Sequence, residues 1–148
     1  LSRFAWAPDG SKVLFANTRA DGVDLHVLDT ATATARKVMD GGLNPVFQAP
    51  QWLADGSLLV LAIPDGRGPM PAESLTPRGP AIQTATGGKQ AQNRTYQDLL
   101  ENPHDEAMFE WLATSQPVIL SGDGRSRRPV GPARIYTSVT PSPDGRYL

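Results

Sequence analysis

The sequence repeats a short turn-forming motif three times along the chain. Each copy centres on the dipeptide Asp-Gly and lies beside strand-like sequence. The copies are Asp9-Gly10, Asp55-Gly56 and Asp144-Gly145, within the segments 4–17, 50–63 and 140–148. Asp-Gly between two apolar runs favours a β-hairpin with a type I′ turn, in which both central residues take a positive φ. Each copy is therefore predicted to form the bend of a hairpin.

The spacing of the copies indicates the architecture. Gly10 and Gly56 are 46 positions apart, and Gly56 and Gly145 are 89 positions apart, which is close to twice the first interval. A repeat period in the mid-forties with several strands per unit is typical of β-propeller blades. We therefore expect an all-β fold built from units that pack against one another.

Each unit can be divided into strands. The first unit is expected to hold strands at 4–7, 12–17, 23–29 and 36–39, and the third and fourth strands of the second unit are expected at 116–121 and 127–130. The prediction is a partial β-propeller with two blades of four antiparallel strands, 1–44 and 45–134, and the start of a third blade in 135–148. An insertion over residues 64–113 would separate the second and third strands of the second blade.

One strand of the first unit alternates clearly. Val23, Leu25 and Val27 alternate with Asp24 and His26, which predicts one buried face and one face that is solvated or packed on a neighbouring blade. His26 is expected on the polar face, with no metal-ligating partner nearby.

The insertion begins as proline-rich sequence and ends with helical sequence. Residues 64–94 contain many Pro, Gly, Gln and Thr, which favour loops, and a short helical turn is expected from Thr95 to Glu101. Asn102-Pro103 is typical of a helix N-cap followed by proline at the first helical position. The following helix, 104–113, has acids in its first turn and places Met108, Trp111 and Leu112 on one side, so it is expected to cover a surface.

Composition excludes several classes of function. The formal net charge is −1 and 39% of the residues are hydrophobic, without an apolar run long enough to span a bilayer. The sequence therefore predicts no membrane segment and no basic footprint for nucleic acid. It contains no cysteine, which excludes disulfides and thiolate metal sites.

No catalytic constellation can be found in the sequence. There is no Gly-x-Ser-x-Gly nucleophile motif and no glycine-rich phosphate loop, and His26 and His104 lack the spacing of a zinc site. We therefore expect no catalytic residue, metal or cofactor in this chain. Arg78 and Arg94 in the insertion are candidates for pairing with an acidic substrate side chain. The alternative is that both are solvated loop charges.

Particular motifs resemble a known family. The blade opening Trp6-Ala-Pro-Asp-Gly10 is similar to blades of TolB-like periplasmic propellers and of the N-terminal propeller of the prolyl oligopeptidase family of serine peptidases. Residues 79–83, Gly-Pro-Ala-Ile-Gln, and the segment from Arg94 to Gln116 look like the propeller of the glutamyl endopeptidase branch of that family. The resemblance covers the whole chain, and residues 79–121 carry most of it.

The resemblance implies an enzyme in two parts. A C-terminal α/β-hydrolase domain, absent from this chain, would hold a Ser, Asp, His triad that cleaves peptides after acidic residues, and the propeller would shield that site. No catalytic residue of the family can be assigned to a position in this chain. The implied partners are a peptide substrate and the hydrolase domain, and the resemblance favours the periplasm or the cell exterior.

Two functions remain open from the sequence. The chain is either a propeller segment that gates substrate access in a serine peptidase, or a TolB-like scaffold that binds a protein and has no hydrolase domain. Because a propeller needs about four to eight blades, both ends of the chain are expected to be cut, with the missing blades elsewhere in a longer polypeptide. A nucleophile motif downstream of Leu148 would distinguish the two functions.

Overall fold

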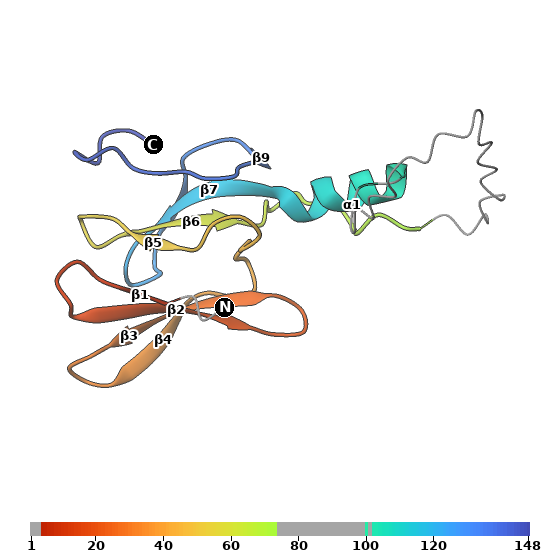
Figure 1. Ribbon diagram of the computed structural model, residues 1–148. Coiled ribbons are helices and arrows are strands. Elements are labelled where there is room, and N and C mark those ends of the chain that lie inside the picture. Colours follow the sequence, from red (N-terminus) through yellow and green to blue (C-terminus); the bar gives the residue numbers. More distant parts are fainter. Residues whose placement is uncertain (1–3, 74–99, 101) are drawn as a thin grey trace, which may run out of the picture.

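The computed structural model describes residues 4–73, 100 and 102–148. Within these residues the fold is mostly β, with two antiparallel sheets and one helix, as expected for an all-β chain (Figure 1). The described part of the chain has no helix that is long and apolar enough to cross a membrane.

The first sheet is a meander of four strands. Its order is β1-β2-β3-β4, and every neighbouring pair is antiparallel. The strands are β1 (Phe4–Trp6), β2 (Lys12–Thr18), β3 (Val23–Asp29) and β4 (Thr34–Met39). These bounds confirm the four strands predicted for the first unit to within two residues at each end.

The second sheet keeps the same order across the insertion. Its strands are β5 (Gln51–Trp52), β6 (Leu58–Ala62), β7 (Thr114–Leu120) and β8 (Arg127–Pro129), with β9 (Arg134–Ile135) paired to the start of β7. Antiparallel β6 and β7 are direct neighbours although residues 63–113 lie between them in the chain. β9 spans the boundary predicted between residues 134 and 135, and the division into blades stays a prediction.

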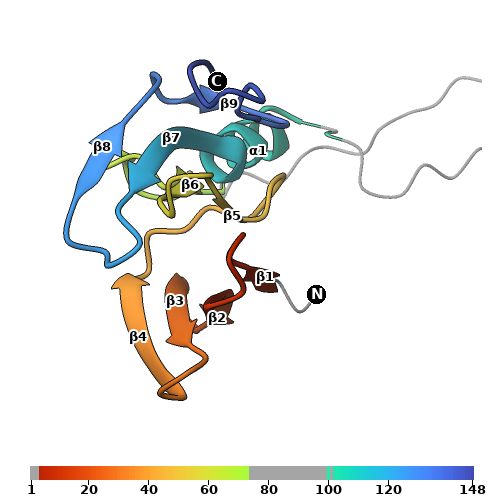
Figure 2. The same cartoon turned by 90° about the vertical axis from the view of Figure 1, so that its left-hand side faces the viewer.

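The core lies between the two sheets. The first sheet contributes Leu14, Leu25 and Val27, and the second contributes Leu58 and Val118, all at most 2% exposed. Figure 2 shows the two sheets as separate groups of strands, and β1 contacts β5 where they meet. Removing these side chains from water stabilises the pairing of the sheets, because apolar burial is the main favourable contribution to folding.

The Asp-Gly turns differ from the predicted type. Gly10 has a φ of +72°, but Asp9 is not among the residues with positive φ, so the prediction of type I′ turns is wrong. Instead the Gly10 N–H donates to the Ala7 carbonyl oxygen at 2.9 Å, and the Asp9 carboxylate accepts from the Ser11 N–H at 2.9 Å. Aspartate bonds in this way to backbone two residues ahead, which leaves only the glycine in the left-handed region.

The same local geometry recurs at the other Asp-Gly turns. Gly56, Gly124 and Gly145 have φ values of +77°, +71° and +68°. The turn at Gly124, which is not one of the three repeat copies, joins β7 to β8, between the strands expected at 116–121 and 127–130. In Figure 1 these hairpin turns lie at one end of the molecule, and the insertion leaves from the opposite end.

Helix α1 (Pro103–Ala113) closes the insertion. The Asn102 side chain accepts a hydrogen bond from the Asp105 N–H at 3.0 Å, and Pro103 begins the helix, which confirms the predicted N-cap. The predicted apolar stripe does not form the buried side, since Leu112 is 45% exposed and Ala113 is the buried residue of the helix. The reason is visible in Figure 1, where the helix extends away from the sheets and joins them only at its C-terminal end.

Candidate functional site

Asn44 fixes the point where the insertion returns to the second sheet. Its side chain is buried, and its Nδ2 donates to the carbonyl oxygens of Leu112 at 2.9 Å and Thr114 at 3.0 Å. Its Oδ1 accepts from the Val46 N–H at 3.2 Å. One buried amide therefore joins the end of α1, the start of β7 and the connection between the sheets.

Arg67 and Trp111 hold the two ends of the insertion together. The Arg67 guanidinium carbon lies 3.7 Å from the centroid of the Trp111 ring, and the indole Nε1 donates to the Gly68 carbonyl oxygen at 2.8 Å. Partial burial lowers the pKa of Arg67 from its usual value, because desolvation disfavours the charged form. An arginine stays protonated under such conditions, so the contact is a cation on an aromatic face.

Apolar side chains remain exposed around this junction. We call Val46, Phe47, Phe109, Leu112 and Ile135 the insertion-end patch; each is between 39% and 47% exposed. The Phe47 and Phe109 rings meet edge to face at 6.4 Å, and α1 contacts β9, which carries Ile135. Contiguous exposed apolar surface of this kind marks protein interaction sites.

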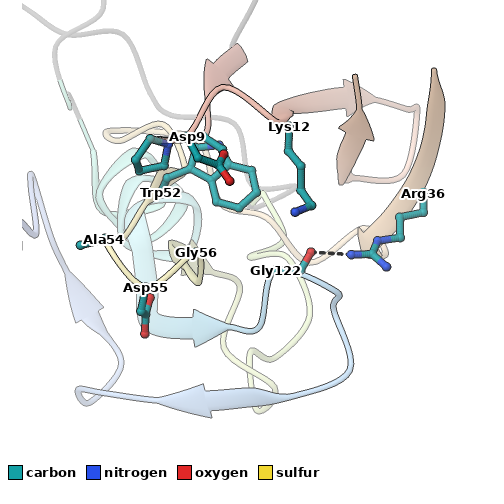
Figure 3. Close-up of a pocket in the computed structure, with 10 residues that line it drawn as sticks. Asp9, Lys12, Arg36, Trp52, Ala54, Asp55, Gly56 and Gly122 are labelled. Carbon is teal, nitrogen blue, oxygen red and sulfur yellow. Dashed lines mark hydrogen bonds between the residues drawn. The ribbon is translucent and has the colours of Figure 1, made fainter. Parts of the chain in front are cut away.

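A pocket opens between the sheets at the end that carries the Asp-Gly turns. Its volume is about 380 Å³, and its lining includes Asp9, Lys12, Arg36, Trp52 and Asp55. Figure 3 shows Arg36 reaching from β4 to the Gly122 carbonyl oxygen, where it donates at 2.8 Å, while Lys12 points into the same space. The Trp52 indole Nε1 donates across the sheets to the Ala5 carbonyl oxygen at 3.1 Å.

The two carboxylates of this pocket belong to turns. The backbone N–H and hydroxyl of Ser11 lower the pKa of Asp9, and the hydroxyl and N–H of Ser57 lower that of Asp55. Hydrogen bonds that favour the charged form hold both groups as anions near neutral pH. The pocket lies at the junction between the two sheets, and both of its carboxylates are held in turns.

The histidines and acids offer no metal centre in the described ranges. These ranges hold no group of three or more His, Cys, Asp or Glu side chains able to bind an ion. His26 stacks on Phe15 at 5.2 Å between ring centroids, and its buried Nδ1 has no hydrogen-bond partner there. Arg78 and Arg94, the two candidates for substrate binding, lie outside the described residues.

Sequence reasoning missed two residues of the junction. Nothing in the pattern around Asn44 distinguishes it from a loop asparagine, because its acceptors come from 68 and 70 positions along the chain. Arg67 stands in a run of Gly and Pro that predicted only a loop. Trp111, as a tryptophan in a helix expected to cover a surface, was the available signal for a cation partner.

The fold and these contacts define an all-β protein with two stacked sheets and an inserted helix. Over 97% of its length the chain is 37% identical to a protein of Oryza sativa subsp. japonica and 34% identical to one of Arabidopsis thaliana, each named "Probable glutamyl endopeptidase, chloroplastic". No family model and no solved structure matches. The chain spans 16% of the length of these relatives. The chain is therefore similar to a part of two proteins that are named as peptidases.

Proposed function

We propose that this chain is the non-catalytic propeller segment of a serine peptidase that cleaves peptides after glutamate. In this proposal it gates substrate access to a separate α/β-hydrolase domain. The similarity to two relatives named glutamyl endopeptidase, over nearly the whole chain, carries the proposal. The repeated antiparallel meander and the stacking of its two sheets support the propeller part.

The insertion-end patch supports a contact with another domain. Its five exposed apolar residues lie around a junction that is held by the hydrogen bonds of Asn44 and by the Arg67–Trp111 contact. A surface that is already held by such contacts loses less conformational entropy when it is covered. We propose that the hydrolase domain lies against this end and that the Asp-Gly turns face away from it.

The direct test uses the full-length polypeptide and a matched pair of substrates. Fluorogenic peptides with Glu or Gln before the scissile bond have nearly the same shape and differ in charge. We expect labelling by a fluorophosphonate and faster hydrolysis of the Glu peptide, because a site built to pair a carboxylate leaves its cation unpaired with the amide. Absence of both labelling and hydrolysis would overturn the proposal.

Arg78 and Arg94 are proposed to pair with the acidic side chain of the substrate. Arg78→Gln and Arg94→Gln should raise KM for the Glu peptide more than for the Gln peptide, since each removes a charge partner. Arg125→Gln is the control, because Arg125 is 88% exposed and lies in an Asp-Gly turn at the other end. An unchanged preference for Glu in both variants would leave these arginines as solvated loop charges.

The alternative is a TolB-like scaffold propeller without a hydrolase domain. The insertion-end patch is compatible with this alternative, because a protein partner other than a hydrolase domain could also cover its exposed apolar residues. A full-length polypeptide that binds no fluorophosphonate and lacks a nucleophile motif would support this alternative over the peptidase.

A further inference from the structure

On the side opposite the core, the first sheet carries apolar side chains together with the polar residues Asp24, His26 and Lys37. Residues that pair across the strands share a face, and two such rows point away from the second sheet. One row is Phe4, Phe15, His26 and Lys37, and the other is Trp6, Val13, Leu28 and Ala35. Phe4 is 62% exposed and Trp6 is 59% exposed. We call these two rows the Trp6 face.

A sheet with one solvated face normally has polar side chains on it. Antiparallel strands of that kind alternate between apolar and polar residues. In β2, however, the core residue Leu14 is flanked by Val13 and Phe15, both on the Trp6 face. Apolar residues on both faces are typical of a sheet that is packed on both sides.

The internal repeat indicates what covers this face. Trp6 and Trp52 occupy equivalent positions, each four residues before the glycine of its Asp-Gly turn. The row that contains Trp52 continues with Leu58 and Leu120, and it packs against the first sheet. The row that contains Trp6 lies on the corresponding face of the first sheet.

The contact made by Trp52 has no counterpart at Trp6. Trp52 Nε1 donates to the carbonyl oxygen of Ala5, the residue directly before Trp6. In the described part of the chain, the indole N–H of Trp6 has no hydrogen-bond partner. The equivalent donor is thus present on the first sheet, beside the exposed ring of Phe4.

On the other side of the second sheet, residues 136–148 form a segment without strands. The third copy of the repeat lies there, where the side-chain amides of Gln48 and Gln51 both donate to the Val139 carbonyl oxygen at 2.9 Å. Leu59 and Leu61 on that side are at most 3% exposed. Pro141 stands at the position of Trp6 and Trp52, and its side chain has no donor. The hydrogen bonds across this junction are donated instead by the glutamines of the second unit to the third copy.

We propose that the Trp6 face packs against a further antiparallel sheet of the same repeat, contributed by the same polypeptide. In the first strand of that sheet, one residue occupies the position equivalent to Trp6. Trp6 Nε1 donates to the backbone carbonyl oxygen of the residue directly before it, as Trp52 Nε1 does to Ala5. The inference rests on the propeller part of the proposed function and is independent of peptidase activity.

Hydroxyl-radical footprinting of the full-length polypeptide tests the covered face. Oxidation of each tryptophan is measured by mass spectrometry in the native protein and in the same protein unfolded in urea. We expect Trp6 to be protected to the same extent as Trp52, and Phe4 to be protected with it. Trp6 oxidised at its unfolded rate would overturn the proposal. Protection that appears only as protein concentration rises would indicate a second copy and would also overturn it.

Matched substitutions test the hydrogen bond. Trp6→Phe and Trp52→Phe each keep an aromatic ring and remove the indole N–H. Both variants should lower the midpoint of urea unfolding of the full-length polypeptide by similar amounts. A lower midpoint for Trp52→Phe alone would overturn the hydrogen bond from Trp6. If a variant does not fold, the footprint of the unaltered protein still tests whether the Trp6 face is covered.

The outcomes also separate this inference from the proposed function. If Trp6 is protected but the polypeptide binds no fluorophosphonate, the proposed stacking stands and the proposed peptidase function fails. If the polypeptide is an active peptidase but Trp6 is exposed, the proposed function stands and the proposed stacking fails.

Discussion

At the scale of single residues, Asp24 shows how this fold accommodates a buried carboxylate. The side chain is 2% exposed, and it accepts a hydrogen bond from the Gly41 N–H at 2.7 Å. Arg19 and Lys37 each approach it to 3.2 Å. Burial acts to raise the pKa of Asp24, but the hydrogen bonds from Gly41 and Lys37 and the charge of Arg19 lower it overall. The charged form is therefore favoured in the folded state.

The lowered pKa of Asp24 predicts a pH-dependent contribution to stability. A carboxylate whose pKa is lower in the folded state stabilises the fold above its unfolded pKa of about 4, and this contribution is lost as the pH falls through the folded value. Asp24→Asn should therefore lower the free energy of unfolding at pH 7. The difference from the unaltered protein should shrink below about pH 4, as measured by urea unfolding across pH.

Asp21→Asn is the matched control for this measurement. Asp21 contacts the same arginine, with its Oδ1 3.5 Å from Arg19 Nε, but its side chain is 75% exposed. An exposed ion pair contributes little to stability, so the control should change little at any pH. A difference for Asp24→Asn that stayed constant from pH 7 to pH 3 would contradict the argument.

The sequence predicted the positions of turns better than their geometry. Asp9-Gly10 located a hairpin because aspartate and glycine favour turns whatever their type. The turn type depends on whether the Asp9 carboxylate bonds to the Ser11 N–H, which a dipeptide pattern does not specify. Likewise the alternation in β3 placed Asp24 on the polar face, but its burial depends on Arg19 and Lys37 from neighbouring segments.

At the scale of elements, helix α1 depends on contacts at its C-terminal end. Only Ala113 in the helix is fully buried, so packing of a broad apolar face contributes little to its stability. The contact between Arg67 and Trp111 connects the helix to the strand-proximal start of the insertion. We therefore expect the stability of α1 to depend on this pair.

A double-mutant cycle on this pair measures the dependence. Arg67→Met and Trp111→Leu should show a coupling energy of about 0.5–2 kcal/mol, since a cation on an indole face contributes that much according to its burial. The readout is the free energy of opening of α1, from native-state hydrogen exchange. Arg125→Met with Trp111→Leu is the control cycle, because Arg125 lies at the opposite end. Coupling no larger than in the control would show that the pair does not stabilise the helix.

Strands were easier to predict than the burial of the helix. Each strand of the first sheet carries apolar residues whose partners are its neighbours in sequence, so local patterning is sufficient. The stripe of Met108, Trp111 and Leu112 has the spacing of a buried face, yet α1 joins the sheets only at its C-terminal end (Figure 1). Periodicity predicts which side of a helix is apolar, and tertiary contacts decide whether that side is covered.

At the scale of the whole molecule, both sheets share one core. Leu25 in the first sheet and Leu58 in the second belong to the same buried cluster, and both are 0% exposed. Elements that share a core tend to open together rather than one at a time. We therefore expect the two sheets to behave as one cooperative unit.

Leu25→Ala tests this cooperation. The substitution should destabilise the protein by about 2–5 kcal/mol, and it should raise native-state hydrogen exchange in β6 as well as in β2 and β3. Thr18→Ala, at an exposed position at the end of β2, is the control and should leave β6 unchanged. Faster exchange confined to the first sheet would contradict a shared core.

The repeat predicted the all-β class and the order of strands across a long interruption. It could do so because the second unit resumes the pattern of the first after the insertion, and hydrogen bonding joins β6 to β7 directly. Neither the Asn44 anchor nor the insertion-end patch could be predicted, because both are formed by residues that are far apart in sequence. Sites of this kind depend on the assembled fold rather than on a local motif.

Because β6 pairs directly with β7, the second sheet does not depend on the length of residues 63–113. Ala62 pairs with Gln116, so the sheet is complete on both sides of the point where the insertion departs and returns. The entropy of closing a loop rises only slowly with its length, by about 0.6 kcal/mol for each doubling. This segment can therefore be lengthened, shortened or exchanged at a small cost in free energy, while the pairing of β6 with β7 stays the same.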